Sequence, residues 1–298
     1  YQIKYMDAVP DSAVCNEAVK LAKRHKFAQL SGFVNGVLRN IARNIDSVQF
    51  DTLSIQYSMP QWIVDRFVAA YGEKKAEEIF KAFHSKSTIS IRTNLTRCTP
   101  DELRVMLEAE GVTVAAVDEL NYAFVISGFD YLNGLQSFRD GLFYVQDISS
   151  MLVAQTAAPK KGDYVIDVCA APGGKSTHIA ELLQGSGHVL ARDLTDNKVD
   201  MIEENIERHG LNNMSAEVWD ATVPDADSAG KADILICDLP CSGLGVLGRK
   251  KDIRYKMTPE SVDELAALQR QILDTVHTYV KPNGVLVYST CTIDEAEN

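Results

Sequence analysis

Residues 164–176, with the sequence YVIDVCAAPGGKS, combine a short apolar run, a turn of small residues and the start of a helix. An apolar run of this length, bounded by turn residues, is typical of a strand buried in a parallel sheet. Gly173 and Gly174 would let the backbone approach a ligand closely at the N-terminus of the following helix. The stretch therefore predicts a strand–turn–helix unit that holds a ligand at the end of its strand.

Strand–helix alternation continues from about residue 160 onward and predicts an α/β fold with a mostly parallel sheet. Strands are expected at residues 164–169, 188–193, 214–219, 232–238 and 284–289, and helices at 175–183, 197–209 and 259–280. Ligands of such sheets bind outside the carboxyl ends of the strands. The residues that follow each strand are therefore the candidate site residues.

The glycine turn has the features of a nucleotide site without a standard phosphate motif. Residues 174–176 (GKS) imitate a phosphate-binding loop, but the glycine required five positions before Gly174 is Cys169. Asp193 lies about twenty residues after the turn, where an acid can bind ribose hydroxyls. Asp220, after the third strand, could flank an adenine ring, although turn formation or helix capping would explain either aspartate alone. Together these features favour an adenosine-type ligand.

Two segments place a cysteine just after a predicted buried strand. They are residues 238–243 (DLPCSG) and 289–291 (STC). Two thiols at one sheet edge, with Asp238 beside the first, suggest covalent catalysis on an electrophilic carbon. The alternative is that both are buried small hydrophobes, which is the favoured interpretation for Cys15, Cys98, Cys169 and Cys237. The six cysteines contain no CxxC pair, so a reduced cytosolic setting is expected and a zinc site is not.

The first part of the chain differs from the rest in its apolar pattern and in its net charge. Residues 12–46, 61–71 and 74–83 have helical apolar spacing, and a small α/β module follows with strands at 88–93, 112–117 and 123–127. Residues 1–100 carry a net charge of +5, whereas residues 101–298 carry −16, within a total of −11. A basic front end suggests contact with a polyanion, and ordinary solvated surface is the alternative. No apolar run approaches the ~18 residues of a membrane span.

The motifs at residues 169–175, 238–243 and 290–291 resemble those of the RNA cytosine-C5 methyltransferases that use S-adenosylmethionine, in the order and on the strands of that family. Residues 141–150 (GLFYVQDISS) resemble the family's segment that packs over the cofactor. Residues 32–40 (GFVNGVLRN) resemble part of a NusB-like RNA-binding helical domain. The combination is typical of the bacterial small-subunit (16S) ribosomal RNA methyltransferases of the RsmB, Sun or Fmu type, in the Nol/Nop/Sun family.

The resemblance implies a class I methyltransferase core, Rossmann-like with a mostly parallel sheet, preceded by a small α/β module and an all-α NusB-like domain. The expected domains are residues 1–58 (NusB-like part), 59–140 (helical linker and RRM-like module) and 141–298 (catalytic core). The family's last strands would follow residue 298, and Tyr1 is not a natural start, so both chain ends are expected to be truncated.

The implied activity is S-adenosylmethionine-dependent C5 methylation of a cytidine in 16S ribosomal RNA or a partly assembled small subunit, by a cytoplasmic monomer without a metal. By resemblance, Cys291 adds to cytosine C6, Cys241 assists the later elimination, and Asp238 hydrogen-bonds the base at N3 or N4, with its protonated form as the donor. Leu239 replaces the family's usual alanine and Lys250-Lys251 a frequent His-Pro, and neither change removes a reacting group.

The expected cofactor contacts are Cys169, Ala170, Ala171, Pro172, Gly173, Gly174, Lys175, Asp193, Lys198, Asp220 and Asp238. Lys175 could instead orient Asp238 or merely cap the turn, and Lys198 could face water. The basic loop at residues 248–256 (GRKKDIRYK) combines cations with a tyrosine, which suits an extruded base and its phosphates. The candidate RNA contacts are Arg249, Lys250, Arg254, Lys256 and, in the front helices, Arg39. A spare surface loop is the alternative.

Two other functions remain open from the residues alone. A methyltransferase acting on a protein or a small molecule would explain the sheet and the turn, but not the two thiols with the basic loop. A non-enzymatic RNA-binding factor would explain the front end, but Asp238, Cys241 and Cys291 would then have no role.

Overall fold

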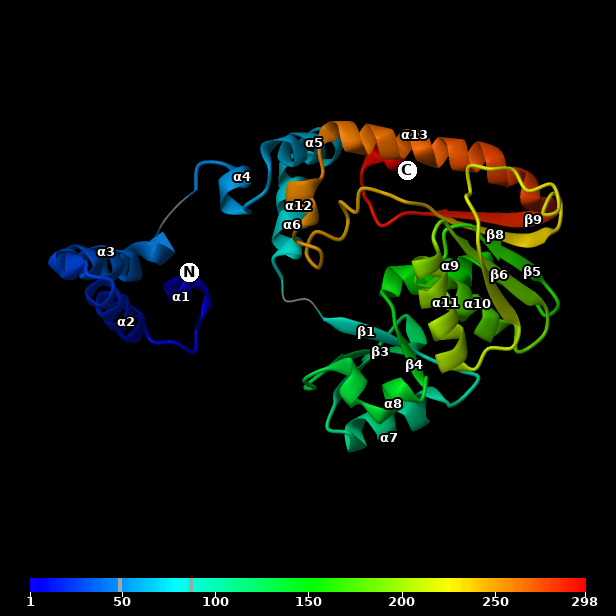
Figure 1. Cartoon of the computed structure of the whole chain (residues 1–298), viewed down its shortest axis with the longest axis horizontal. Helices are drawn as coiled ribbons and strands as arrows, with labels where there is room; N and C mark the ends of the chain where they lie inside the picture. The colour runs from blue at the N-terminus through cyan, green and yellow to red at the C-terminus, as the bar shows by residue number, and fades with distance from the viewer. Residues whose placement is uncertain (48–49, 86–87) are drawn as a thin grey trace. The chain divides into compact units, whose positions relative to one another are not determined.

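The structure is a computed structural model that describes residues 1–47, 50–85 and 88–298. The chain forms two compact units, Tyr1–Met59 and Pro60–Asn298. The first unit is helical, as expected, and α2 packs on α3 (Figure 1). Its elements are α1 (Gln2–Tyr5), α2 (Asp11–Arg24), η1 (Ala28–Leu30), α3 (Ser31–Asn44), η2 (Ile45–Ser47) and α4 (Leu53–Gln56).

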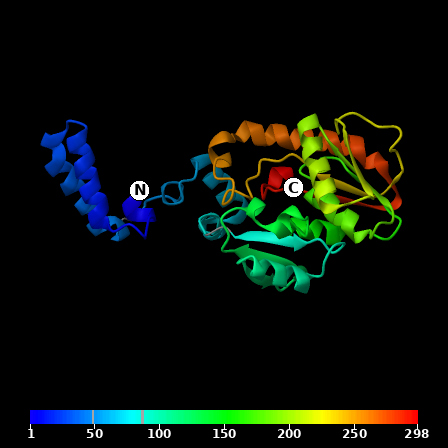
Figure 2. The same cartoon turned by 60° about the horizontal axis from the view of Figure 1, so that its bottom comes forward.

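The second unit begins with two helices and a small antiparallel sheet of strand order β2-β3-β1-β4. Its elements are α5 (Gln61–Tyr71), α6 (Glu73–Phe83), β1 (Ile89–Thr93), α7 (Pro100–Ala109), β2 (Thr113–Val117), β3 (Leu120–Ser127), η3 (Leu132–Gly134), α8 (Gln136–Arg139) and β4 (Phe143–Val145). A capping box between Thr99 and Glu102 starts α7. One face of the sheet buries Ile91 and Phe124 against α7, and the other faces α9 (Figure 2).

The larger sheet has the strand order β7-β6-β5-β8-β9, and all its neighbouring strands are parallel. This confirms the predicted α/β core. Its elements are α9 (Ile148–Ala157), β5 (Tyr164–Asp167), α10 (Gly174–Leu182), β6 (His188–Asp193), α11 (Asp196–His209), β7 (Met214–Val218), β8 (Ala232–Asp238), α12 (Ile253–Lys256), α13 (Pro259–Val276), η4 (His277–Tyr279), β9 (Val280–Ser289) and η5 (Glu295–Glu297).

Alternate residues of the central strands face opposite helical layers. Val165 and Ile236 pack with α9, α10 and α11, whereas Ile166 and Leu235 pack with α13. In Figure 1, α13 lies on the opposite side of the sheet from α9, α10 and α11. Because side chains alternate along a strand, strands covered on both faces are apolar throughout, which explains the uninterrupted apolar runs. Because all five strands are parallel, their carboxyl ends meet at one edge of the sheet.

The last helix and strand differ from the expectation. Helix α13 ends at Val276 and β9 starts at Val280, where a helix was expected to continue. Tyr279 and Val276 keep a helical apolar spacing, so the periodicity does not mark the change. Among the helices of the described residues, none has the length and apolar composition needed to cross a bilayer.

Buried charges join the small sheet to the core. Arg92 of β1 is 1% exposed and lies 2.8 Å from the Glu181 carboxylate of α10. It also donates to Thr177, and His209 of α11 approaches the other oxygen of Glu181. Burial lowers the pKa of Arg92 and His209. Because a buried charge is tolerated only with its partner, this cluster favours one packing of the small sheet on the core.

Candidate active site

The glycine turn is fastened to the neighbouring strand β6. Gly173 has a φ of +98°, which favours glycine, and it is the N-cap of α10. The Ala171 amide donates to the Asp193 carboxylate over 2.9 Å. The other Asp193 oxygen accepts from the Leu194 amide and from Lys198 Nζ, both over 2.8 Å. The turn, Asp193 and Lys198 are thus brought together.

A cavity of about 390 Å³ opens at the carboxyl ends of β5, β8 and β9. We call it the active-site cavity. Its lining consists of Tyr144, Val145, Gln146, Asp147, Ser150, Asp167, Ala170, Ala171, Pro172, Gly174, Lys175, Asp238, Val246, Arg249, Lys250 and Cys291. The cavity therefore unites most of the predicted turn with Asp238, Cys291 and two residues of the basic loop. Cys169, Gly173, Asp193, Lys198 and Asp220 lie outside this lining.

The two candidate thiols lie side by side. Strands β8 and β9 are adjacent and parallel, with Asp238 opposite Ser289, so the segments after them emerge together. The Gly245 amide donates to the Cys291 carbonyl over 3.1 Å, which ties the two segments. Cys241 Sγ and Cys291 Sγ are 3.0 Å apart.

This contact makes the two thiols unequal. Hydrogen bonding from Cys241 lowers the pKa of Cys291 to about 7, against burial and the Asp238 charge, and Lys250 and Lys175 help. The same hydrogen bond, with burial, raises the pKa of Cys241. Cys291 is exposed, whereas Cys241 is partly buried. The arrangement favours Cys291 as the thiolate and Cys241 as the thiol that retains its proton.

Asp238 accepts hydrogen bonds on both carboxylate oxygens. Lys175 Nζ donates to Oδ2 over 2.5 Å, and the Ser289 hydroxyl donates to Oδ1 over 2.8 Å. The Lys175 and Asp238 side chains are 15% and 30% exposed. Lys175 therefore forms a partly buried ion pair with Asp238 at the cavity wall.

Asp167, which ends β5 and lines the cavity, was not predicted as a site residue. Asp167 is 1% exposed and accepts from the Ser176 hydroxyl over 2.5 Å. Burial raises its pKa to about 7. The sequence could have indicated Asp167, because an acid inside an apolar strand is buried and must have a hydrogen-bond or ionic partner.

A buried polar group also supports the Cys241 segment and was not predicted. The Glu297 side chain accepts from the Ser242 amide over 2.8 Å and from Gln269 over 3.0 Å. Gln269 of α13 also donates to the Pro240 carbonyl over 2.8 Å. Glu297 is 2% exposed. These contacts join residues far apart in the chain, so no local pattern announces them.

The basic loop is only partly available to a ligand. Arg249 pairs with Asp147, Lys250 lines the active-site cavity, and Lys256 is exposed beside Asp252. The prediction that Arg254 contacts RNA is wrong. Arg254 is 4% exposed and donates to the Leu247 carbonyl, so it holds the loop instead of facing RNA. In the first unit, the exposed Arg39 donates to Asn35 over 3.1 Å.

The remaining candidates have structural contacts. Asp220 is exposed and accepts from the amide and hydroxyl of Thr222, a turn contact. Burial raises the pKa of Cys169 and raises that of Cys237 to about 12, which fits packing thiols. Across residues 1–47, 50–85 and 88–298, no cluster of three His, Cys, Asp or Glu side chains could hold a metal ion.

Three family models match separate segments of the chain. The family model described as 16S rRNA methyltransferase RsmB/F matches residues 154–298. The NusB family matches residues 1–43, and the RsmF/B-like ferredoxin-like domain matches residues 59–129. Among solved structures, "Crystal Structure of PH0851" has a TM-score of 0.81 and 26% identity, covering 97% of this chain and 67% of that chain.

Curated relatives extend over the whole chain. The probable ribosomal RNA small subunit methyltransferase B of Bacillus subtilis is 38% identical, with 100% of this chain and 68% of the relative covered. The ribosomal RNA small subunit methyltransferase B of Proteus mirabilis is 33% identical, with 100% and 70% covered. With a methyltransferase core, a NusB part and a ferredoxin-like part in the same order, the chain belongs to the ribosomal RNA small subunit methyltransferase B family of S-adenosylmethionine-dependent enzymes.

Proposed function

We propose that this chain methylates C5 of a cytidine in small-subunit ribosomal RNA through a covalent adduct between Cys291 and C6. The observation that carries the proposal is the pair of thiols 3.0 Å apart at the ends of β8 and β9. A methyltransferase acting on a nucleophilic oxygen or nitrogen needs no thiol, whereas cytosine C5 becomes nucleophilic only after addition at C6. The proposal gives each thiol a separate task.

The residues around the turn fit S-adenosylmethionine. A cavity of about 390 Å³ lies within the usual range of ligand sites. A Cβ at Gly174 would lie 3.1 Å from the Tyr144 ring, so the absence of a side chain keeps this wall open. Asp193 ends β6 and Asp220 follows the adjacent β7, where they would meet the ribose and the adenine, with Lys198 beside Asp193. When bound, the cofactor supplies an electrophilic methyl group.

The chain's own residues prepare the base. The Cys291 thiolate forms a bond to C6, and electron density moves to C5. Asp238, held by Lys175 and Ser289, accepts a hydrogen bond from the cytosine N4 amine and fixes the ring. After C5 has gained its methyl group, the C5 proton passes to solvent, and the electron pair of the C5–H bond re-forms the C5–C6 double bond as the Cys291–C6 bond breaks. The Cys291 sulfur leaves as a thiolate, and the Cys241 thiol, 3.0 Å away, stabilises it by donating a hydrogen bond.

The target cytidine must be unpaired or extruded, because a base inside a duplex cannot meet a thiol at C6. Lys250, Lys256 and Arg249 would contact RNA phosphates near the cavity, and Arg39 would add a contact in the first unit.

The family matches at residues 1–43, 59–129 and 154–298 support the proposed division into domains at 1–58, 59–140 and 141–298.

The test is transfer of a labelled methyl group from S-adenosylmethionine to 16S ribosomal RNA, with a denaturing gel for protein–RNA adducts. Wild type should label the RNA, and Cys291→Ala should abolish both label and adduct. Cys241→Ala should accumulate a gel-stable adduct, because elimination is blocked. Cys237→Ala, a buried thiol outside the cavity, is the matched control and should behave as wild type. Label in Cys291→Ala RNA would contradict the mechanism.

A second outcome would identify another acceptor. If calorimetry shows cofactor binding but no RNA is labelled, the fold stands and the substrate is a protein or a small molecule. RNA containing 5-fluorocytosine separates these cases, because it should trap the wild-type adduct permanently and leave the Cys291→Ala protein free.

A further inference from the structure

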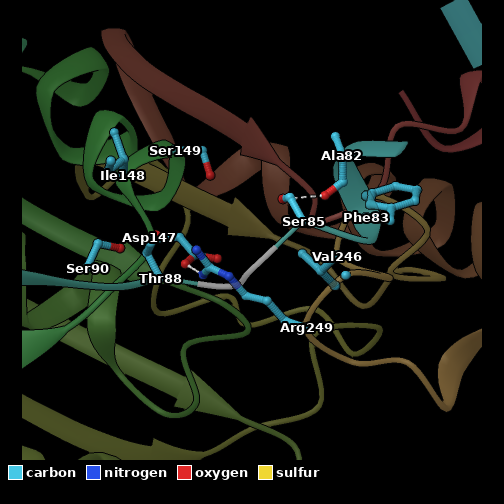
Figure 3. Close-up of a pocket in the computed structure, with 12 residues that line it drawn as sticks. Ala82, Phe83, Ser85, Thr88, Ser90, Asp147, Ile148, Ser149, Val246 and Arg249 are labelled. Carbon is cyan, nitrogen blue, oxygen red and sulfur yellow. Dashed lines mark hydrogen bonds and ion pairs between the residues drawn. The ribbon is translucent and has the colours of Figure 1, made fainter. Parts of the chain in front are cut away.

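A second cavity of about 390 Å³ lies beside the active-site cavity. We call it the side cavity. It is formed by the end of α6, the start of β1, the first turn of α9 and the segment after Cys241 (Figure 3). None of the thiols, the glycine turn or Lys175 lines it. The side cavity is therefore a separate space from the one that the proposed chemistry uses.

The two cavities share one wall. Asp147, Val246 and Arg249 line both of them. In Figure 3 the Arg249 side chain reaches across to the Asp147 carboxylate. These side chains are 44% and 34% exposed, and ion pairs this close to water contribute about 0–1 kcal/mol. The pair can therefore open at little cost, which would make the two cavities continuous.

The lining of the side cavity suits an uncharged polar group with an apolar body. Apart from Asp147 and Arg249, its lining within the described residues carries no charge. Ser85, Thr88 and Ser149 are exposed and carry hydroxyls, a group that can both donate and accept. The Ser85 hydroxyl donates to the Ala82 carbonyl over 2.7 Å, so Ser85 offers a ligand its acceptor side. Ala82, Ile148 and Val246 add apolar surface. A nucleobase with its ribose has this combination of apolar faces and polar edges.

We propose that the side cavity binds the nucleotide next to the target cytidine in a single-stranded stretch of RNA. Arg249 leaves Asp147 and binds the phosphodiester between the two nucleotides, since guanidinium forks match phosphate oxygens. The inference rests on the proposed function, because the target base occupies the active-site cavity. It adds a specificity site that requires a neighbouring base.

The experiment combines a filled cavity with an incomplete substrate. Ser149→Trp, in the first turn of α9, should place an indole in the side cavity, and Ser149 does not line the active-site cavity. The substrates are an RNA fragment that wild type methylates, and two versions with an abasic ribose on the 5′ or the 3′ side of the target. In wild type, one abasic version should lower kcat/KM about tenfold, as expected for the loss of one bound base.

Ser149→Trp should lower kcat/KM about tenfold on the intact fragment, with no further loss on that abasic version, because both changes remove one interaction. Gln271→Trp, on exposed α13 in a different cavity, is the matched control and should keep the wild-type profile. S-adenosylmethionine binding by calorimetry should be equal in all three proteins. A methylphosphonate linkage at the bridging position should weaken binding to wild type but not to Arg249→Ala.

The outcomes separate this inference from the proposed function. If wild type labels no cytosine C5, the proposed function fails and this inference fails with it. If wild type labels the RNA but the Ser149→Trp and abasic effects multiply, or neither has an effect, only the side-cavity site is overturned.

Discussion

The Cys291 thiol has a lowered pKa because its neighbour Cys241 donates a hydrogen bond to it. Its alkylation rate by iodoacetamide should therefore reach half of its maximum near pH 7. Removing the donor in Cys241→Ala should move that midpoint toward the ordinary thiol value of about 8.5. Mass spectrometry of the Cys291 peptide gives the rate at each pH.

The matched control for this measurement is Cys237→Ala, which removes a buried thiol that does not line the active-site cavity. Its midpoint should equal that of wild type. A Cys241→Ala midpoint that stays near pH 7 would show that Lys175 and Lys250, rather than Cys241, set the acidity.

Asp167 should make stability depend on pH. Its folded pKa of about 7 exceeds the ordinary 3.9, so the neutral acid is favoured in the folded state. Its contribution is complete below the ordinary pKa and is lost as the pH rises to about 7. In Asp167→Asn the side chain is always neutral. Relative to this variant, wild type should therefore lose roughly 1.4 kcal/mol per pH unit between about pH 4 and 7.

Urea unfolding of both proteins at several pH values measures this difference. Burial lowers the pKa of His178 and of His209, which makes stability rise with pH, but both histidines are present in the two proteins and cancel. Parallel stability curves would show that Asp167 is ionised in the folded state below pH 7.

At this scale, the reacting groups were predictable and their supports were not. Cys241, Cys291 and Asp238 follow recognisable apolar runs, so their position at one sheet edge follows from the alternation of strands and helices. Glu297 and Asp147 support the site by contacting residues that are far away in the chain, which no local pattern indicates. Arg254 was wrongly expected to face RNA, because a charged residue in a basic loop gives no sign of its burial.

At the scale of the elements, the close approach of the segments after β8 and β9 requires a glycine at position 245. A Cβ at Gly245 would lie 2.8 Å from the Cys291 carbonyl oxygen, which is closer than real contacts allow. Gly245→Ala should therefore displace Cys291 and lower methyl transfer at least about tenfold, with an overpacking penalty of about 1–3 kcal/mol. Calorimetry should show nearly unchanged cofactor affinity, because Gly245 does not line the active-site cavity.

Gly36→Ala is the control, since nothing lies within 4 Å of the added Cβ in α3. It should preserve activity and should stabilise its helix slightly. Normal turnover by Gly245→Ala would mean that the two segments relax without moving the thiol. The close approach of these segments was not predictable, because it depends on the pairing of β8 with β9, which are far apart in the chain.

In the whole molecule, every contact described for the active-site cavity lies within Pro60–Asn298. A protein lacking residues 1–59 should therefore keep its affinity for S-adenosylmethionine and the pH profile of Cys291 alkylation. Its affinity for RNA should fall at least about tenfold, if the first unit contributes a second attachment point. Filter binding at fixed salt measures this, and unchanged RNA affinity would assign the first unit another role.

The three-part organisation was predictable because each part has its own pattern: helical spacing, short alternating strands, and apolar strands between helices. The cluster of Arg92, Glu181 and His209 that joins the small sheet to the core was not. Each of these residues looks like ordinary surface charge in the sequence, and only the packing of β1 on α10 and α11 makes them partners.

Two sulfur atoms 3.0 Å apart are about one ångström from the length of a disulfide. A peroxide would convert the Cys291 thiolate into a sulfenic acid, and the Cys241 thiol would displace water to close the bond. We therefore expect low peroxide to abolish methyl transfer in wild type and dithiothreitol to restore it. In Cys241→Ala, lacking the resolving thiol, oxidation should proceed past the reversible stage. The geometry that lets the enzyme release its product also makes it sensitive to oxidants.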